Sequence, residues 1–388
     1  MILRFGFRNF LSFEEGVECS FESDYEGISK VNTLLSIRGA NGAGKTNLLK
    51  ALAFFMDFVA NSFNLKPDAP TGVIPFFNSQ KPTDFFVEFK TEDVESPVFL
   101  YELSLTKEKV VSERITRTIH RSTTIIERHE NSIETIADFS ELKRIKIRSN
   151  ASLISCAHQN EIKALNSIYY IFYMVISNIT LSHSYMTLFF DCAEDYGKPM
   201  LSCSAQFYYK NKELLDKAKK FISECDIGIR DIQIKKEQSI DGEEVFSPIF
   251  YHQRGEEIYP LPYSSESRGT QFLFINLLHF LHVSQRPHSL LIFDELDMSL
   301  HPFLTKKIIS LFIEPNEKDA SSCGQMVFTA HDTTIIDTLK ADKSFLLNKE
   351  GNESFGYRID ECSSAIIRKD RSIRTPYEQG RIGGVPNI

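Results

Sequence analysis

One stretch of the chain has the residue types and the spacing that bind a triphosphate. Residues 39–46 read Gly-Ala-Asn-Gly-Ala-Gly-Lys-Thr, which fits the pattern G-x-x-x-x-G-K-[ST] in full. A short apolar run precedes the glycines, and apolar residues recur at helical spacing after them, so the loop joins a strand to a helix N-terminus. Backbone N–H groups and the helix dipole attract phosphate oxygens there. The alternative is a glycine-rich turn that only caps a helix, but the complete match favours a nucleoside triphosphate site.

The polar positions of this phosphate loop have expected partners on a nucleotide. Lys45 is predicted to reach the β- and γ-phosphates, and the Thr46 hydroxyl is predicted to ligate Mg²⁺. ATP and Mg²⁺ are therefore the expected ligands. The other residues of the loop that we expect to contact the nucleotide are Gly39, Asn41, Gly42, Gly44 and Asn47.

A second group of chemically active residues follows a buried strand. Residues 290–293 form a continuous apolar run, as in parallel sheets, and lead into Asp294 and Glu295. At the end of such a strand, Asp294 is predicted to hold the hydrated Mg²⁺, and Glu295 to polarise the attacking water as general base. The alternative is an acidic cap of the helix that follows. The presence of a phosphate loop in the same chain favours the catalytic interpretation.

Two further stretches narrow the class of protein. Residues 264–271 form a small polar loop with a glycine before a helix, which is again typical of an anion site. His331 follows the next apolar strand, which places an imidazole at the C-terminal end of that strand. Alone, His331 would be interpreted as a capping or core histidine. The order and spacing of all the motifs favour a place in the nucleotide site.

The ordered set of motifs resembles the ABC-type ATPase heads shared by SMC proteins, RecF and OLD-family nucleases. The Asn-Phe-Leu-Ser-Phe opening, the phosphate loop and Ser267-Arg268-Gly269 in the place of the ABC signature carry the resemblance, with 294–302 as extended Walker B and D-loop. The resemblance implies that His331 is the switch histidine. It implies that two subunits sandwich ATP, with Ser267 and Gly269 contacting nucleotide in trans. It also places Gln159 near the Q-loop glutamine, although an exposed polar turn predicts the same residue.

A closer resemblance is to the stand-alone ATPases of bacterial abortive-infection systems, of the AbiL and PARIS type. It is carried by Glu266-Ser267-x-Gly269-Thr270, by 297–302 and by the tail 377–386. Such ATPases are typically encoded with a Toprim-like nuclease, so the resemblance implies a nuclease effector as partner in antiviral defence. The turn 340–343 reads Lys-Ala-Asp-Lys, where an Arg-Arg-Asp-Gln-like turn is common in that group.

Strand and helix patterns, together with this resemblance, predict an α/β P-loop NTPase of ABC type, with mixed sheets in two lobes. We expect an N-terminal ATPase lobe at 1–160, whose first 38 residues form three strands. A helical insertion is expected at 161–240, with room for two or three helices. Its apolar face is either a partner interface or ordinary core. A C-terminal ATPase lobe with signature, Walker B, switch histidine and basic tail is expected at 241–388.

Composition sets outer limits on the protein class. The chain has 388 residues and a net charge of −8, so its surface is not basic all over. Seven cysteines without a C-x-x-C pair indicate free thiols and a cytoplasmic location. No charged residue lies between Lys163 and Asp191, but polar residues interrupt this segment. We therefore expect a buried helix or helix–strand pair there, and not a membrane span.

Two basic clusters leave DNA as a possible partner. Residues 143–148 alternate basic residues with isoleucine, which predicts a strand with one basic, solvated face. Either cluster is a DNA contact or only a charged solvent-facing surface. The alternative function is accordingly a RecF-like DNA-binding ATPase in repair or recombination. The second cluster lies in the tail and consists of Arg368, Lys369, Arg371, Arg374 and Arg381.

Overall fold

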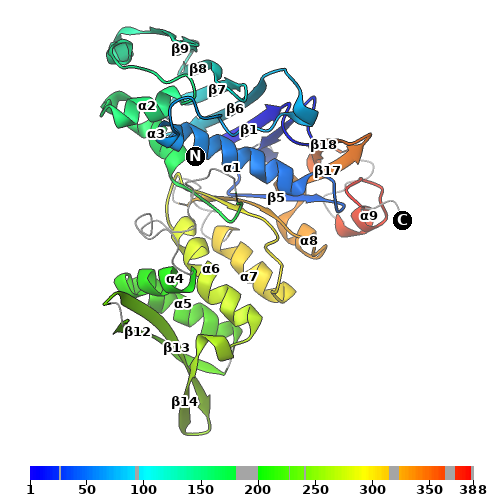
Figure 1. The fold of residues 1–388 in the computed structure, drawn as a ribbon. Helices are drawn as coiled ribbons and strands as arrows, with labels where there is room; N and C mark the ends of the chain where they lie inside the picture. The colour runs from blue at the N-terminus through cyan, green and yellow to red at the C-terminus, as the bar shows by residue number, and fades with distance from the viewer. Residues whose placement is uncertain are drawn as a thin grey trace.

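The chain folds around one long helix that lies between two sheets (Figure 1). The computed structural model describes residues 1–25, 28–91, 96–180, 200–226, 228–239, 242–313, 323–362 and 372–385. Within these residues there are sheets of seven, six, three and two strands. The seven-stranded sheet and the central helix occupy the upper part of Figure 1, and a helical lobe with the three-stranded sheet occupies the lower part.

The seven-stranded sheet is antiparallel throughout and has the order β10-β9-β8-β7-β6-β1-β2. Buried and partly exposed residues alternate without a break in β6 and β7, so one face of the sheet packs on the core and the other faces solvent. Its strands are β1 (Ile2–Arg8), β2 (Val17–Ser20), β6 (Thr83–Lys90), β7 (Val98–Leu105), β8 (Val110–Thr118), β9 (Ser122–His129) and β10 (Ser132–Thr135).

The six-stranded sheet has the order β11-β15-β16-β5-β17-β18 and is parallel except for β18. All residues of β11, β15 and β16 are buried, as expected for strands covered on both faces. The strands are β5 (Leu34–Gly39), β11 (Val175–Ser177), β15 (Leu290–Phe293), β16 (Gln325–Thr329), β17 (Ser344–Glu350) and β18 (Glu353–Arg358).

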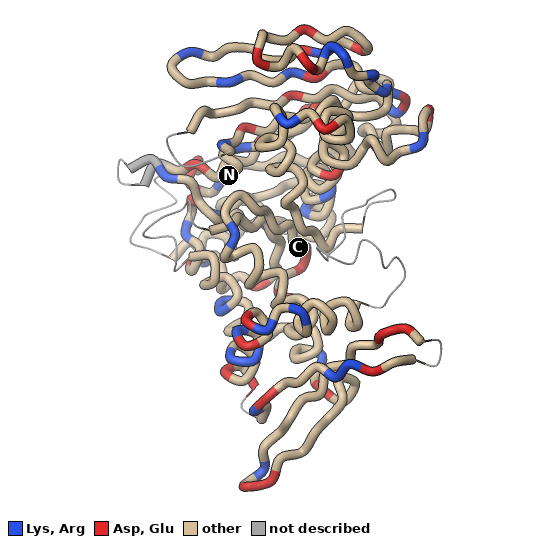
Figure 2. Tube along the Cα trace, turned by 90° about the vertical axis from the view of Figure 1, so that its left-hand side faces the viewer, with Lys and Arg blue, Asp and Glu red and all other residues tan. Residues whose placement is uncertain are grey.

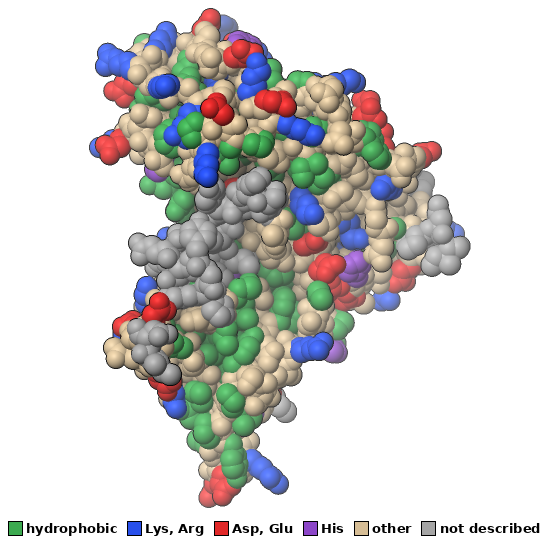
Figure 3. All heavy atoms as spheres, viewed as in Figure 1, with side chains coloured by type: hydrophobic (Ala, Val, Ile, Leu, Met, Phe, Trp, Pro, Cys, Tyr) green, Lys and Arg blue, Asp and Glu red, His purple; other side chains and the backbone are tan. Residues whose placement is uncertain are grey.

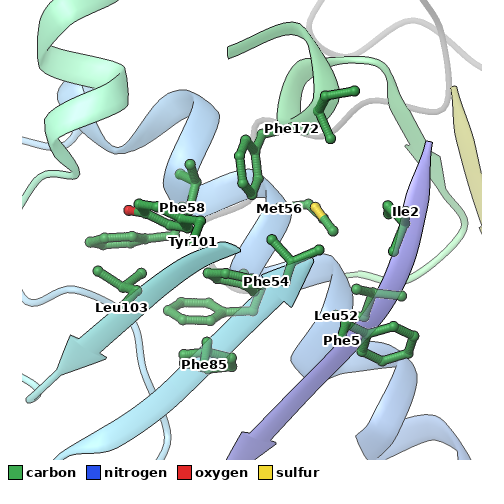
Figure 4. Close-up of a cluster of buried hydrophobic side chains, with 14 of the residues drawn as sticks. Ile2, Phe5, Leu52, Phe54, Met56, Phe58, Phe85, Tyr101, Leu103 and Phe172 are labelled. Atoms are coloured by element: carbon green, nitrogen blue, oxygen red, sulfur yellow. The ribbon is translucent and has the colours of Figure 1, made fainter. Parts of the chain in front are cut away.

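Helix α1 (Lys45–Asn61) fills the space between these two sheets, and nearly all of its residues are buried. Its phenylalanines pack against strand residues of the antiparallel sheet and against α3 (Asn166–Tyr173), as Figure 4 shows for Phe54, Phe85 and Phe172. The Phe55 and Phe85 rings stack with centroids 5.1 Å apart. This aromatic packing fixes the helix, and therefore the loop at its N-terminus, relative to the antiparallel sheet and α3.

A second apolar core lies on the other face of the central sheet, between that sheet and the helices of the lower lobe. Hydrophobic side chains also gather on the outer surface of this lobe (Figure 3). The lobe contains α4 (Met200–Lys210), α5 (Lys212–Cys225), α6 (Arg268–Ser284) and α7 (Pro302–Ile313), with β12 (Ile229–Gln238), β13 (Glu244–Arg254) and β14 (Glu257–Pro262) as its sheet. The remaining strands and α-helices are β3 (Glu22–Tyr25), β4 (Ile28–Val31), α2 (Leu153–Gln159), α8 (Ile335–Leu339) and α9 (Arg374–Glu378).

The prediction of a P-loop α/β fold with mixed sheets is confirmed, and two local predictions are wrong. Residues 1–38 contain five strands and not three, because β3 and β4 form a separate hairpin. Residues 143–148 form no strand: a 3₁₀ segment (Ala137–Arg144) precedes an irregular stretch. Arg148 donates to the carbonyl oxygens of Phe63 and Leu65 at 2.8 and 2.9 Å, which holds this stretch against the chain after α1.

The uncharged segment after Lys163 contains a helix–strand pair, α3 and β11, as far as residue 180. Its continuation into 181–190 lies outside the described residues, as do Arg368, Lys369 and Arg371 of the tail. Among the described residues no helix is long and apolar enough to span a membrane. The described part of the interval 161–240 contains α3, α4 and α5, together with β11 in the central sheet and β12 in the lower lobe.

Candidate functional site

Four neighbouring strands of the central sheet end at the same edge, and each is followed by polar residues. Parallel pairing sets Phe293 of β15 beside Phe328 of β16, and Thr329 beside Ile37 of β5. The chain leaves β5 into the phosphate loop, β15 into Asp294, and β11 into Asn178. Because the carboxyl ends of parallel strands gather polar loops at one edge, residues far apart in sequence meet there.

A pocket of about 560 Å³ lies at this edge, and we call it the phosphate pocket. It contains most of the residues that the sequence predicts for the nucleotide site. Gly39, Ser267, Gly269 and Gln159 do not line it. Its lining residues are Asn41, Gly42, Gly44, Lys45, Thr46, Asn47, Asp294, Glu295 and His331.

Backbone carbonyl oxygens of the phosphate loop hold its lysine in place. Gly44 has φ 106° and precedes the first residue of α1, and a Cβ at this position would lie 2.5 Å from Ser354 Oγ. The Lys45 ammonium donates to the carbonyl oxygens of Gly39 (2.8 Å) and Ala40 (3.1 Å). Burial lowers the pKa of Lys45, and the carboxylates of the site, Asp294 first, oppose that shift. This cation lies at the pocket that phosphates would enter.

Two side-chain oxygen atoms that could ligate Mg²⁺ lie next to each other in the pocket. The Thr46 hydroxyl donates to Asp294 Oδ2 at 2.8 Å, although the two residues are 248 positions apart. The Thr329 hydroxyl donates to Asp294 Oδ1 at 2.5 Å and so orients the carboxylate. Among the described residues no cluster of three or more His, Cys, Asp or Glu side chains is suited to a metal. One carboxylate, one hydroxyl and substrate phosphates form the ligand set that Mg²⁺ uses in nucleotide sites.

Glu295 is exposed toward the phosphate pocket and has an unusual backbone. Its φ is 55°, which is uncommon for a residue with a Cβ. The Glu295 N–H donates to Thr329 Oγ1 at 2.7 Å, and this bond helps to keep the residue in that conformation. Strained backbone of this kind gathers at functional sites, where the surrounding structure enforces it.

The loop that carries His331 is anchored by an aspartate of the D-loop. Asp297 Oδ2 accepts the backbone N–H groups of His331 (2.8 Å) and Asp332 (2.7 Å). The imidazole itself is exposed and lines the phosphate pocket. Asp297 therefore links the position of the histidine to the segment that follows Glu295.

Sequence reasoning missed three residues that shape the site. Asn178 follows β11, donates to the Asp294 carbonyl oxygen (2.9 Å) and accepts the Asp294 N–H (2.8 Å). Ser12 accepts from the Asn47 side chain at 2.9 Å, so the opening turn supports the phosphate loop. Thr329 orients Asp294, as described above. A polar residue directly after each buried strand was the available signal, but β11 has only three residues and is hard to recognise.

The placement of Gln159 in a Q-loop is not supported by the structure. Gln159 is exposed at the end of α2, and the Ser152 hydroxyl at the start of α2 donates to the Val59 carbonyl oxygen at 2.7 Å. Val59 lies near the C-terminal end of α1, whereas the phosphate loop is at the N-terminal end. At 1.5 Å per residue these ends are about 21 Å apart. Asn178 occupies the position beside Asp294 instead.

The signature turn, residues 267–269, begins α6 and lies outside the phosphate pocket. Ser267 caps the helix by accepting the Thr270 N–H at 3.1 Å, and Thr270 in turn donates to Asp226 Oδ2 at 3.2 Å. A Cβ on Gly269 would lie 3.3 Å from the Ser299 carbonyl oxygen. Helix α6 reaches the cavity next to the phosphate pocket only through Phe272.

Comparison with known proteins places this site in a family. Residues 34–337 match the family described as "AAA domain, putative AbiEii toxin, Type IV TA system". No curated protein matches the chain. The chain has 15% identity and a TM-score of 0.46 to an SMC head bound to the C-winged helix domain of ScpA, over 92% of this chain and 97% of that one. For the SMC head domain from Thermotoga maritima, the values are 12%, 0.42, 92% and 98%. The family match runs from the start of β5 into α8 and spans the phosphate loop, Asp294 and His331, and the chain belongs to this family of P-loop ATPase-type domains.

Proposed function

We propose that the chain binds and hydrolyses Mg²⁺-ATP, that ATP closes a dimer of two copies, and that the nucleotide state controls a partner effector in antiviral defence. The contact between Thr46 and Asp294 carries this proposal. It joins the phosphate loop to the strand-end carboxylate, with Glu295 and His331 on the same pocket. Substrate binding, metal binding and water activation then have candidate groups within one chain.

Each group has a distinct role in the proposed reaction. Lys45 would turn from the loop carbonyl oxygens to the β- and γ-phosphates, while Thr46 and Asp294 would hold Mg²⁺, which neutralises phosphate charge when bound. Glu295 would accept a proton from the attacking water. His331 would contact the γ-phosphate from the strand beside Asp294. Asn178 would hold the backbone of Asp294 in place during these events.

The proposed dimer rests on the position of the signature turn. Ser267 and Gly269 lie outside the phosphate pocket of their own chain, so an anion-binding helix start is left for a second copy. Two large apolar side chains on the D-loop and the start of α7, Met298 and Phe303, are 62% and 74% exposed. Exposed apolar side chains beside a site support a protein interface there.

The proposed role in defence rests on the family and on the sequence resemblance. The family description names a putative toxin and a type IV toxin–antitoxin system. The resemblance to AbiL- and PARIS-type ATPases adds a nuclease, of Toprim type, as the effector. We propose that the ATPase restrains or releases this effector according to its nucleotide state. Expression of the chain with the product of its neighbouring gene, followed by pull-down and mass measurement, tests the partner directly.

A second candidate, direct DNA binding, is favoured by one surface. Lys143, Lys146 and Arg148 line a common cavity. Asparagine side chains, among them Asn131 and Asn150, line the same cavity. Elsewhere on the antiparallel sheet, acidic and basic residues are interspersed (Figure 2). Binding of a fluorescent DNA duplex, lost in Lys143→Ala with Lys146→Ala, supports this candidate. Equal binding by the parent and the double variant contradicts it.

The proposed enzymatic activity has a simple test. The purified chain should release phosphate from ATP in the presence of Mg²⁺, and EDTA should stop the reaction. Glu295→Gln should still bind ATP while losing turnover. A parent chain that binds ATP without hydrolysing it would leave a nucleotide-binding module and would rule out the ATPase.

A further inference from the structure

Arg38 is a buried cation directly before the phosphate loop. Its side chain is 1% exposed, and Nη1 donates to the carbonyl oxygen of Asp332 at 3.0 Å. Its Nε and Nη2 have no hydrogen-bond partner in the described part of the chain. Burial lowers the pKa of Arg38, against the opposing effect of Tyr377, Asp297 and Asp332. A buried guanidinium with unused donors is costly to stability, which is consistent with a role beyond packing.

Asp297 holds the same loop through its backbone N–H groups. Its Oδ2 accepts the N–H groups of His331 and Asp332, whereas its buried Oδ1 has no hydrogen-bond partner among the described residues. Arg38 thus binds a carbonyl oxygen of this loop, and Asp297 binds two of its N–H groups. Each side chain also retains polar atoms for a further contact. The loop that carries His331 is therefore held by two charged side chains that both retain unused hydrogen-bonding atoms.

The C-terminal segment, residues 372–385, packs on this loop as well. The Thr333 hydroxyl, two residues after His331, donates to Glu378 Oε1 at 2.7 Å. Asp337 of α8 accepts the N–H groups of Ile373 (2.8 Å) and Arg374 (3.1 Å). Figure 1 shows α9 of this segment beside β17 and β5. The segment is therefore tied both to the loop and to the helix that follows the loop.

The docking of the C-terminal segment depends on close backbone approach. Gly383 has φ +72°, and a Cβ there would lie 2.7 Å from the Tyr357 hydroxyl oxygen. That hydroxyl donates to the Ile382 carbonyl oxygen at 2.8 Å, and Asn348 Oδ1 accepts the Gly384 N–H at 2.8 Å. Glycine at this position lets the chain lie flat on β17 and β18. The contact is consequently specific, and not a loose tail on the surface.

We infer that Arg38 and the C-terminal segment are positioning elements for His331, so that ATP hydrolysis depends on residues that do not touch ATP. This inference rests on the proposed ATPase function. Arg38 fixes the Asp332 backbone through its carbonyl oxygen, and Glu378 fixes Thr333 through its hydroxyl. A partner that displaced the C-terminal segment would release one of these two supports and slow hydrolysis without blocking the pocket.

Two substitutions test the inference, each with a conservative match. Arg38→Met removes the donor to Asp332 while keeping an unbranched buried side chain, and Arg38→Lys keeps a donor. Thr333→Val removes the hydroxyl at constant shape, and Thr333→Ser keeps it. For Arg38→Met we expect kcat to fall by about tenfold or more while ATP affinity stays within about threefold of the parent. We expect a smaller loss of kcat in Thr333→Val, and recovery in Arg38→Lys and Thr333→Ser.

Hydrogen exchange adds a readout that does not depend on turnover. The amides of His331 and Asp332 should exchange faster in Arg38→Met than in the parent, because their loop has lost one anchor. Thr116→Val, on the solvent face of β8, serves as the control and should change neither quantity. Thr333 is only partly buried, so Thr333→Val keeps the test valid even if Arg38→Met fails to fold.

The outcomes separate this inference from the proposed function. If the parent hydrolyses ATP and Glu295→Gln does not, the ATPase stands. Parental kcat in both Arg38→Met and Thr333→Val then overturns the positioning role alone. The positioning role is also overturned if these variants lose ATP affinity by as large a factor as they lose kcat, because the damage then lies in the phosphate pocket. A parent without ATPase activity overturns the proposed function and this inference together.

Discussion

The phosphate pocket gathers its side chains from the ends of three strands, β5, β15 and β16, whereas Ser267 and Gly269 lie apart from it at the start of α6. In the pocket, the Thr46 hydroxyl donates to Asp294 Oδ2. At the signature turn, the polar groups are used locally, because Ser267 caps its own helix. The central sheet thus gathers in one chain the groups that we propose for nucleotide, metal and water. Ser267 and Gly269 lie outside the phosphate pocket of their own chain. This difference supports the proposal that the signature turn contacts nucleotide bound by a second copy.

The largest effect on the phosphate pocket is expected from Glu295→Gln. This change keeps the shape of the side chain and removes the base, and loss of a general base typically costs about 10²–10⁴-fold in rate. ATP binding should persist, so the variant should accumulate as a larger species with ATP than with ADP. Light scattering with each nucleotide measures this. Glu108→Gln, on an exposed turn, is the matched control. If Glu295→Gln retains the parental rate, the base lies elsewhere and His331 is the next candidate.

Lys45→Ala is expected to act on binding and not on chemistry. Hydrogen bonds to charged groups contribute about 1.5–3 kcal/mol each, so ATP affinity should fall by about 10–100-fold. Calorimetry with ATP measures the change, and Lys66→Ala, on an exposed turn after α1, is the control. Undiminished ATP affinity would contradict the phosphate-loop interpretation. The comparison of the phosphate pocket with the signature turn would then no longer hold.

Asn178→Ala tests the support of the metal-binding carboxylate. The change removes both hydrogen bonds to the Asp294 backbone, and a buried group left without its partner costs about 1–3 kcal/mol. We expect kcat to fall and the Mg²⁺ concentration for half-maximal ATPase activity to rise. Asn64→Ala, on an exposed turn, should leave both unchanged. An unaltered Mg²⁺ dependence would show that Asp294 needs no such support.

The smallest predicted effect is a pH dependence of stability, and we expect it in α6, the helix that begins at the signature turn. Burial lowers the pKa of His279 to about 3, and it lowers that of His282 to about 4, with Arg286 adding to the second shift. The unfolded chain then binds more protons than the folded one from the ordinary histidine pKa of 6.5 down to these values. Stability should therefore be complete above about pH 6.5 and fall as the pH is lowered.

Hydrogen exchange at pH 7 and pH 5 locates this effect. We expect the amides of α6 to lose protection at pH 5 by more than those of α1, because α1 contains no histidine. The double variant His279→Gln and His282→Gln should show a weaker pH dependence. Equal loss of protection in both helices would remove the assignment to these histidines.

Sequence predicted the phosphate pocket well because its residues follow strands of clear pattern. The run 290–293 marks both a strand and the place where Asp294 must lie, and residues 39–46 mark a strand–helix junction. The sequence did not predict Asn178, because β11 is only three residues long and its neighbour in the sheet is more than a hundred residues away. Gln159 does not line the phosphate pocket, and its local turn gives no information about where α2 packs.

The local sequence pattern also could not predict the contacts that hold the loop of His331. Arg38 is one position before Gly39, and nothing in its neighbours in sequence shows that Tyr377 and Asp332 surround it. The basic alternation at 143–148 predicted a strand, but Arg148 is bound to two carbonyl oxygens and the stretch is irregular. Long-range hydrogen bonds override strand propensity at such places.

The shared site between two copies is tested most directly by mixing two inactive variants. Gly269→Asp should stop hydrolysis by placing a carboxylate against the partner's γ-phosphate. Lys45→Ala should suppress hydrolysis by loss of binding when the ATP concentration is kept well below the Kd of this variant. Gly269→Ala controls for crowding against the Ser299 carbonyl oxygen. An equal mixture of the first two variants should recover up to about a quarter of parental activity, because half of the dimers are mixed and each has one intact site. No recovery, when tagged pull-down shows that mixed dimers have formed, would contradict a signature turn that acts in trans.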